Sequence, residues 1–125
     1  MGFVLLANRF YEQVWRHAAE RRELRPGETP EDVVNEFNAS TIEDMNIACT
    51  WAPRRRDDGG EMYSFAAITT DPPPEISEVG HDRCIVPIKA ENVDAWMHPN
   101  PKNLDACYAI LEDRERPYHE HRLAA

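Results

Sequence analysis

The segment that most constrains this chain runs from Glu61 to Ile88. Its two ends, Met62–Thr70 and Cys84–Ile88, are rich in β-branched and aromatic residues, which favours two strands. Between them, Pro72–Pro74 lack amide donors and cannot continue a β-ladder. The polar tripeptide His-Asp-Arg that begins at His81 then leads into the second strand. Because loops held by rigid strands often carry chemistry, we expect any functional site of this chain to include His81.

Charge limits what the chain can bind without a dedicated site. Its 125 residues carry a formal net charge of −9. Affinity for DNA comes largely from Lys and Arg side chains that displace counterions, so an acidic chain is a poor general binder of nucleic acid. The basic run Arg54–Arg56 is partly neutralised by Asp57 and Asp58, which favours a solvated loop over a DNA-binding patch. Any contact with DNA must therefore be local.

Length and cysteine content indicate one domain in a reducing compartment. A chain of this length suits a single domain with a real core, and it has no apolar run long enough to cross a bilayer. Cys49, Cys84 and Cys107 leave one cysteine over in any disulfide scheme, which is typical of reducing compartments. We therefore expect residues 1–125 to form a single domain of a soluble, cytoplasmic protein with no membrane partner.

The first part of the chain predicts a strand and then a helix. Phe3–Tyr11 is apolar and then polar, which indicates a buried strand with Glu12 at its end. Gln13–Arg25 has apolar residues at helical spacing and predicts a helix. In Thr29–Phe37 the local signals leave two possibilities open: a helix capped at its first residue, or a short strand over residues 33–37.

The middle of the chain predicts two antiparallel neighbours. Met45–Trp51 alternates between apolar and polar residues, as a half-buried strand does. Pro53–Gly60 is polar and rich in glycine, which favours an exposed hairpin loop leading into the strand Met62–Thr70. We also expect a short helical turn over Glu75–Val79.

Two helices and a final strand are predicted towards the C-terminus. Glu91–Met97 has apolar residues on one helical face. Asn100 is predicted to cap a second helix, because Pro101 then occupies its first turn. The buried stripe of this second helix is predicted to be Leu104, Cys107, Tyr108 and Leu111. Tyr118–Leu123 completes an α+β fold with a mixed, mostly antiparallel sheet and helices at its rim.

Two residues can carry acid/base chemistry, and each has an ordinary alternative. His81 can act as a general acid or base beside Asp82, or it is a loop histidine that hydrogen-bonds to backbone. Glu12, at the end of an apolar strand, can serve as a proton donor, or it is a strand-end carboxylate paired with Arg9 or Arg16.

Metal binding has weaker support. His81 and Cys84 are separated by two residues, which is a spacing found between metal ligands. His119 and His121 fall on one face of a predicted strand. Neither pair has the second half of a recognisable site. We therefore predict no metal and no cofactor.

Three stretches, taken in order, resemble the SRAP family of SOS response-associated peptidases. They are Leu5–Glu12 with its Phe-Tyr-Glu signature, Ile47–Trp51, and the Thr69-Thr70 pair followed by the tripeptide at His81. The resemblance covers most of the chain from Phe3 onward. It implies a sheet that curls towards a barrel, and it favours the strand over the helix at residues 33–37.

The same resemblance implies a function. Members of the family cross-link covalently to abasic sites in single-stranded DNA, as part of the DNA damage response. Carried over residue by residue, it implies that Glu12 and His81 are catalytic. Arg83 can hold a phosphate, and Trp51 can stack on an exposed base, although Trp51 is more readily explained as a core residue.

The chain departs from the family at the nucleophile. Family members use a cysteine at position 2, whose amine and thiol close a thiazolidine on the opened sugar, whereas this chain has Gly2. The Phe-Tyr-Glu signature also lies near the middle of a chain about twice this length in the family, by the usual size of such domains. We therefore expect a counterpart of the family's C-terminal half, without its cysteine and active-site asparagine. The alternative is a non-catalytic remnant that forms a homodimer or binds a partner protein covering the missing half.

Overall fold

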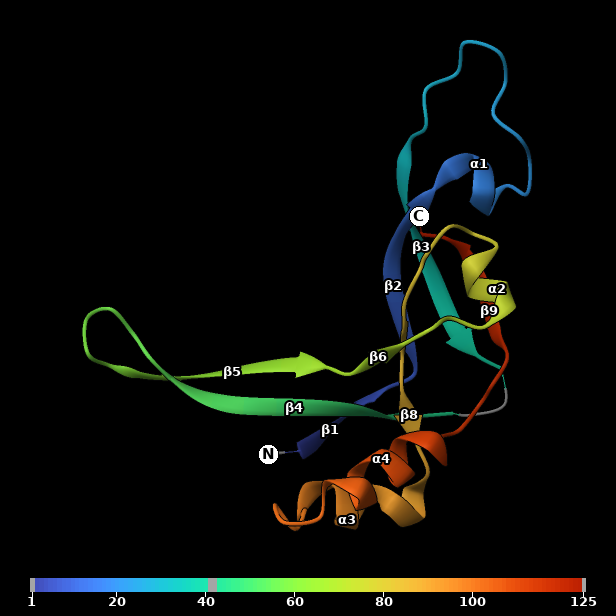
Figure 1. The fold of residues 1–125 in the computed structure, drawn as a ribbon. Helices are drawn as coiled ribbons and strands as arrows, with labels where there is room; N and C mark the ends of the chain where they lie inside the picture. The colour runs from blue at the N-terminus through green and yellow to red at the C-terminus, as the bar shows by residue number, and fades with distance from the viewer. Residues whose placement is uncertain (1, 41–42, 125) are drawn as a thin grey trace. The chain divides into compact units, whose positions relative to one another are not determined.

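The computed structural model describes residues 2–40 and 43–124 (Figure 1). The described residues divide into two compact units, and each is assembled from separate stretches of the chain. The first unit holds residues 2–6, 45–69 and 85–116, and the second holds residues 7–40, 43–44, 70–84 and 117–124. The prediction of a single domain therefore stays a prediction.

The first unit is built on a mostly antiparallel sheet. Its strands are β1 (Gly2–Ala7), β4 (Met45–Arg55), β5 (Glu61–Ala67) and β8 (Pro87–Ile88). They follow the order β1-β4-β5, and β8 also pairs with β4. Figure 1 shows β4 and β5 as a long hairpin, in which Cys49 lies opposite Ala67. The helices of this unit are η1 (Ala90–Asn92), α3 (Val93–Met97) and α4 (Leu104–Glu112).

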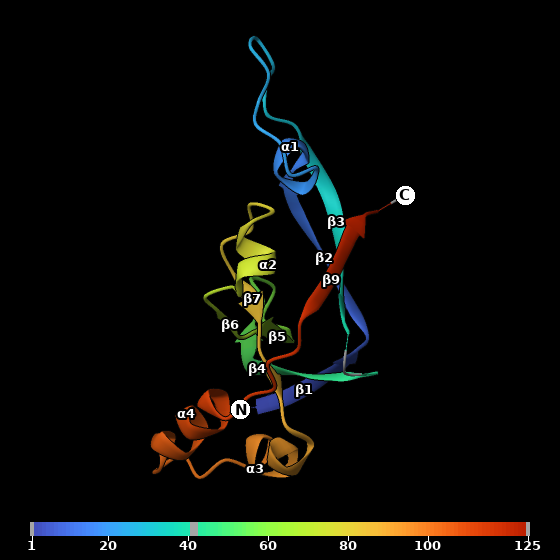
Figure 2. The ribbon, with the colours of Figure 1, turned by 90° about the vertical axis from the view of Figure 1, so that its right-hand side faces the viewer.

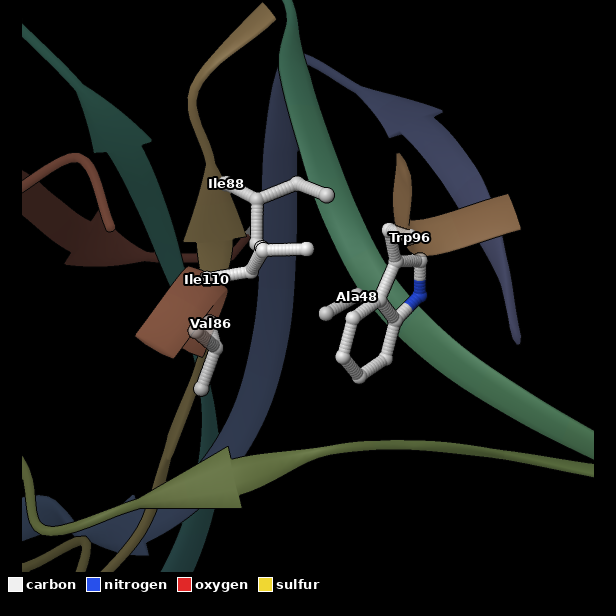
Figure 3. Close-up of a cluster of buried hydrophobic side chains, with 5 residues drawn as sticks. All are labelled: Ala48, Val86, Ile88, Trp96 and Ile110. Atoms are coloured by element: carbon white, nitrogen blue, oxygen red, sulfur yellow. The ribbon is translucent and has the colours of Figure 1, made fainter. Parts of the chain in front are cut away.

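Apolar side chains from this sheet and its helices form the core of the first unit (Figure 3). One buried cluster of this core consists of Ala48, Val86, Ile88, Trp96 and Ile110. The indole N–H of Trp96 donates to the backbone carbonyl oxygens of Phe3, at 3.0 Å, and Cys49, at 3.2 Å. Trp96 therefore fastens α3 to β1 and β4 by hydrogen bonds as well as by apolar contact.

The second unit is built on a three-stranded antiparallel sheet in the order β2-β3-β9. Its strands are β2 (Arg9–Trp15), β3 (Asp32–Ala39) and β9 (His119–Leu123), and its helices are α1 (Arg16–Ala19) and α2 (Pro74–Ser77). Figure 2 shows α2 beside β9. Two short strands, β6 (Thr69–Thr70) and β7 (Cys84–Ile85), pair with each other.

The register of the β2-β3-β9 sheet decides which side chains share a face. Glu12 lies opposite Asn35, and Phe37 lies opposite both Phe10 and His121. Because side chains alternate along a strand, these residues point to one face, which we call the inner face. Its members are Phe10, Glu12, Val14, Asn35, Phe37, His119 and His121. Ile76 and Val79, from α2 and the turn after it, are both buried.

Most of the sequence expectations about this fold are confirmed. The fold is α+β with mostly antiparallel sheets, and the strands of the described residues do not close into a barrel. The open choice at residues 33–37 is resolved as strand β3. The turn at α2 and the final strand β9 form where they were predicted. The antiparallel pair β4–β5 also forms, but β4 continues to Arg55, into the segment that was predicted as a loop.

Two expectations near the N-terminus are wrong. Phe3–Tyr11 is not one buried strand, because β1 and β2 are separated at Asn8, and Leu6 is 67% exposed. Gln13–Arg25 is not a helix, because β2 pairs with β3 through Trp15. The cross-strand ladder outweighs local helix propensity there, and only the four residues of α1 are helical.

The predicted start of the last helix is also wrong. The side chain of Asn100 accepts a hydrogen bond from the amide of Lys102 at 3.0 Å, which forms a turn, and α4 begins only at Leu104. The predicted buried stripe is covered only in part, because Cys107 and Leu111 pack against the core, whereas Leu104 and Tyr108 are exposed. Ile110, which was not predicted, enters the core. In the part of the chain that the structure describes, no helix is long and apolar enough to cross a membrane.

Candidate functional site

Glu12 and His81 meet in the second unit. The Nε2 atom of His81 lies 3.1 Å from the Oε2 atom of Glu12. Glu12 comes from the inner face of β2, and His81 follows the turn at the end of α2. The sequence separates these residues widely, and the fold makes them contact partners.

A glycine allows the chain to turn from α2 back towards β2. Gly80 has a φ of +92°, in the left-handed region that side chains other than glycine rarely adopt. A Cβ atom there would also lie 3.3 Å from the Trp15 indole. The next residue, His81, donates its amide to the carbonyl of Ile76 at 3.4 Å. The turn therefore places His81 directly after a constrained glycine.

The hydrogen bonds of His81 indicate where its protons lie. Its Nδ1 atom is 2.6 Å from the carbonyl oxygen of Arg83 and 3.3 Å from the Arg83 amide nitrogen. The shorter contact requires Nδ1–H to donate to the carbonyl, so we assign the proton to Nδ1. Nε2 then faces the Glu12 carboxyl group across 3.1 Å, which is hydrogen-bond distance for one proton between the two groups. Such a pair can give a proton to a ligand and take one back.

Both side chains remain within reach of a ligand. The His81 side chain is 20% exposed and that of Glu12 is 34% exposed. They line an open groove of about 780 Å³ in the second unit, which we call the Glu12–His81 groove. Its lining also includes Tyr11, Trp15 and Asp82. This volume falls in the range of small-molecule sites and can hold a nucleotide-sized group.

Arg83 and Trp51, the predicted DNA contacts, are placed differently. The guanidinium of Arg83 lies 3.4 Å from the carboxylate of Asp71, and its side chain is 46% exposed. Trp51 belongs to β4 of the first unit, where its ring meets the Tyr63 ring edge-on at 5.4 Å. It is half-buried and is not a member of the core cluster. The structure thus brings Glu12 and His81 together. Arg83 follows His81 by two residues and pairs with Asp71, and Trp51 belongs to the other unit.

Two groove residues were missed in the sequence. Tyr11 and Trp15 line the Glu12–His81 groove and are exposed. They share the outer face of β2, because residues two and four apart in a strand point the same way. The strand was predicted to end before Gln13, where a helix was predicted to begin. Trp15 was therefore not recognised as a strand residue on the same face as Tyr11.

The remaining candidate ligands for a metal do not gather. In residues 2–40 and 43–124, no three His, Cys, Asp or Glu side chains are arranged to hold an ion. His119 is instead buried against Glu75. All three cysteines are free, and burial raises the pKa of the Cys49 thiol, which disfavours the reactive thiolate.

Comparisons with known proteins found a matching family and similar solved structures. A family model described as SOS response associated peptidase (SRAP) matches residues 3–124. A crystal structure of a Bordetella bronchiseptica protein is similar at a TM-score of 0.64 and 17% identity, over 98% of this chain and 54% of that one. A crystal structure of a Bacteroides thetaiotaomicron protein is similar at a TM-score of 0.64 and 14% identity, over 98% of this chain and 48% of that one.

These structural likenesses show the fold alone. The chain spans about half the length of the solved structures that it matches. No curated protein matches the chain significantly.

Proposed function

Because the chain belongs to the family of SOS response associated peptidases (SRAP), we propose that it acts on abasic sites in single-stranded DNA. The observation that carries the proposal is the contact between His81 and Glu12 at 3.1 Å, in an open groove. The substrate class follows from the family, and the pair supplies the proton chemistry that this substrate needs. We also expect the protein to act in the cytoplasm.

An opened abasic sugar presents an aldehyde, and the proposed reaction is the capture of that aldehyde by an amine of the chain. The amine adds to the carbonyl carbon to form a carbinolamine. The carbinolamine hydroxyl then takes a proton and leaves as water, while the nitrogen loses a proton and an imine forms. His81 assists the loss of water, and Glu12 handles proton transfer at the sugar.

Neighbouring groups can position the DNA. Arg83 can bind a backbone phosphate, at the expense of its contact with Asp71. Tyr11 and Trp15 present exposed aromatic surface on which a flanking base can stack. Trp51, which is half-buried in the first unit, is a further candidate for stacking. These contacts are local, as an acidic chain requires.

A trapping assay tests the proposal. Single-stranded DNA with one abasic site is incubated with the folded chain and borohydride, which reduces the imine to a stable amine, and adducts are read on a denaturing gel. We expect a band that requires both borohydride and the abasic site, and that forms much more slowly in Glu12→Gln and His81→Ala. His98→Ala is a matched control, because His98 also lies 3.3 Å from a carboxylate, that of Asp94 in the first unit. Absence of a band, or equal loss in the control, would overturn the proposal.

A second candidate function is protein interaction. The exposed apolar side chains of α4, Leu104 and Tyr108, favour it. Residues of α4 and its surroundings line an apolar groove of about 680 Å³ in the first unit. Leu104 is 60% and Tyr108 is 64% exposed there. Exposed apolar patches of this kind often mark interaction sites. Concentration-dependent dimerisation that Leu104→Asp abolishes, in a chain without affinity for DNA, would favour this function over the first.

A further inference from the structure

We propose that Glu75 and His119 form a positioning pair, which holds the turn that carries His81 and so keeps His81 against Glu12. The expected effect on trapping of abasic DNA rests on the proposed function, whereas the expected effect on the position of His81 does not. Both partners belong to the second unit, and neither lines the Glu12–His81 groove.

The pair is a directed attachment between α2 and β9. The Oε1 atom of Glu75 accepts a hydrogen bond from the backbone amide of His119 at 3.1 Å, and it lies 3.0 Å from Nδ1 of the same residue. The side chains are 10% and 3% exposed. One carboxylate oxygen is thus held by two donors of one residue, in a buried setting where such bonds are strong.

Short helices depend on such attachments. The helix α2 has four residues, and an isolated helix of that length does not form in water. Ile76 in α2 and Val79 in the turn after it bury apolar surface, but apolar burial is not directional. Glu75 supplies the directional contact that sets where α2 lies along β9.

Backbone hydrogen bonds connect the position of α2 to that of His81. Glu75 is followed by Ile76, whose carbonyl accepts the amides of Val79, at 3.3 Å, and His81, at 3.4 Å. The amide of Gly80 donates to Ser77 at 3.0 Å. The segment from Glu75 to His81 is therefore one hydrogen-bonded turn, and a shift at its start moves His81 relative to β2.

The partner residue is itself well fixed. The His119 ring meets the Phe10 ring edge-on at 5.6 Å, on the inner face of the sheet. Its Nε2 atom is buried and has no hydrogen-bond partner among the described residues. An Nε2–H group there would be a buried donor without an acceptor, so Nδ1 carries the proton and donates to Glu75.

The charge of Glu75 fits this role. Burial works to raise its pKa, but the hydrogen bonds from the His119 ring and from backbone amides outweigh burial, so the pKa lies below its ordinary value. Glu75 therefore accepts both bonds as a carboxylate. A glutamine at this position keeps an oxygen that can accept them, whereas an alanine does not.

Nuclear magnetic resonance of the histidine rings tests the positioning directly. In ¹⁵N-histidine-labelled protein, long-range ¹H–¹⁵N spectra report which ring nitrogen of His81 carries the proton and whether the ring is held. We expect the Nδ1–H pattern in the wild type and in Glu75→Gln, and the averaged pattern of a free imidazole in Glu75→Ala. The matched control is Glu36→Ala, because Glu36 is an equally buried carboxylate of the same unit, held by Arg9 and Arg122 on the outer face.

An unchanged His81 pattern in Glu75→Ala, or the same change in Glu36→Ala, would overturn the proposal. If Glu75→Ala does not fold, the milder comparison of His119→Asn with His119→Ala decides it. Asparagine keeps a donor near the Nδ1 position, so we expect it to preserve the His81 pattern that alanine loses.

Borohydride trapping provides the functional readout. We expect Glu75→Ala to slow trapping by roughly 10²-fold, as a misplaced reacting group does, and Glu75→Gln to restore most of the rate. If the wild type traps no abasic DNA, the proposed function fails, and the spectra still decide whether Glu75 positions His81.

Discussion

Replacing Trp96 by phenylalanine separates hydrogen bonding from burial in the core of the first unit. Trp96 is 4% exposed, and its N–H is shared between the carbonyls of Phe3 and Cys49. Phenylalanine keeps most of the apolar contact but leaves the Cys49 carbonyl buried without this donor. An unsatisfied buried group costs about 1–3 kcal/mol, and the space left by the smaller ring adds about 1 kcal/mol. We therefore expect Trp96→Phe to lower the free energy of unfolding by about 2–4 kcal/mol.

Urea unfolding measures this loss, with the slope of the transition checked for a change. The neighbouring Met97→Ala is a suitable control, because Met97 is 41% exposed and its truncation should cost below about 0.5 kcal/mol. A loss under about 1 kcal/mol for Trp96→Phe would refute the argument that these hydrogen bonds fasten α3 to the sheet. A loss of equal size for Met97→Ala would do so as well.

Three further predictions concern the turn, the pH dependence and the chemistry. Gly80→Ala should lower the midpoint of unfolding and slow trapping, because its left-handed φ and its closeness to Trp15 both oppose a side chain. The two hydrogen bonds from the Arg22 guanidinium lower the pKa of Glu28 to about 2. The stability that Glu28 contributes is therefore present above about pH 4.5 and is lost as the pH falls towards 2. Urea midpoints of wild type and Glu28→Gln should therefore converge in acid. If the imine is the covalent product, as proposed, no adduct should survive denaturation without borohydride, and a heat-stable band would contradict this.

The candidate site could be predicted because its residues lie in short, distinctive stretches. The Phe-Tyr-Glu and His-Asp-Arg segments identified Glu12 and His81, and the structure shows these two side chains in contact. Their roles in catalysis stay predictions. The strands β4 and β5 were predictable for a similar reason, since alternation and a glycine-rich turn are local signals.

The errors arose where distant partners decide local structure. Residues 13–15 have no strand pattern of their own, and they extend β2 because β3 pairs with them. The predicted stripe of α4 has helical spacing, but spacing cannot say whether a neighbour covers it, and Leu104 is open. Likewise, nothing near Glu75 in the chain indicates that His119 binds it. Register and packing are long-range properties, and a local pattern does not contain them.

The central claim is that Glu12 and His81 act as one proton-sharing pair at an abasic site. The most direct test is a double-mutant cycle on the rate of borohydride trapping, with Glu12→Gln, His81→Ala and the double variant. If the residues act as a unit, the double variant should trap DNA about as slowly as the slower single variant, because either change removes the shared proton. If the two effects instead multiply, or if either single variant traps at the wild-type rate, the pair does not act as proposed.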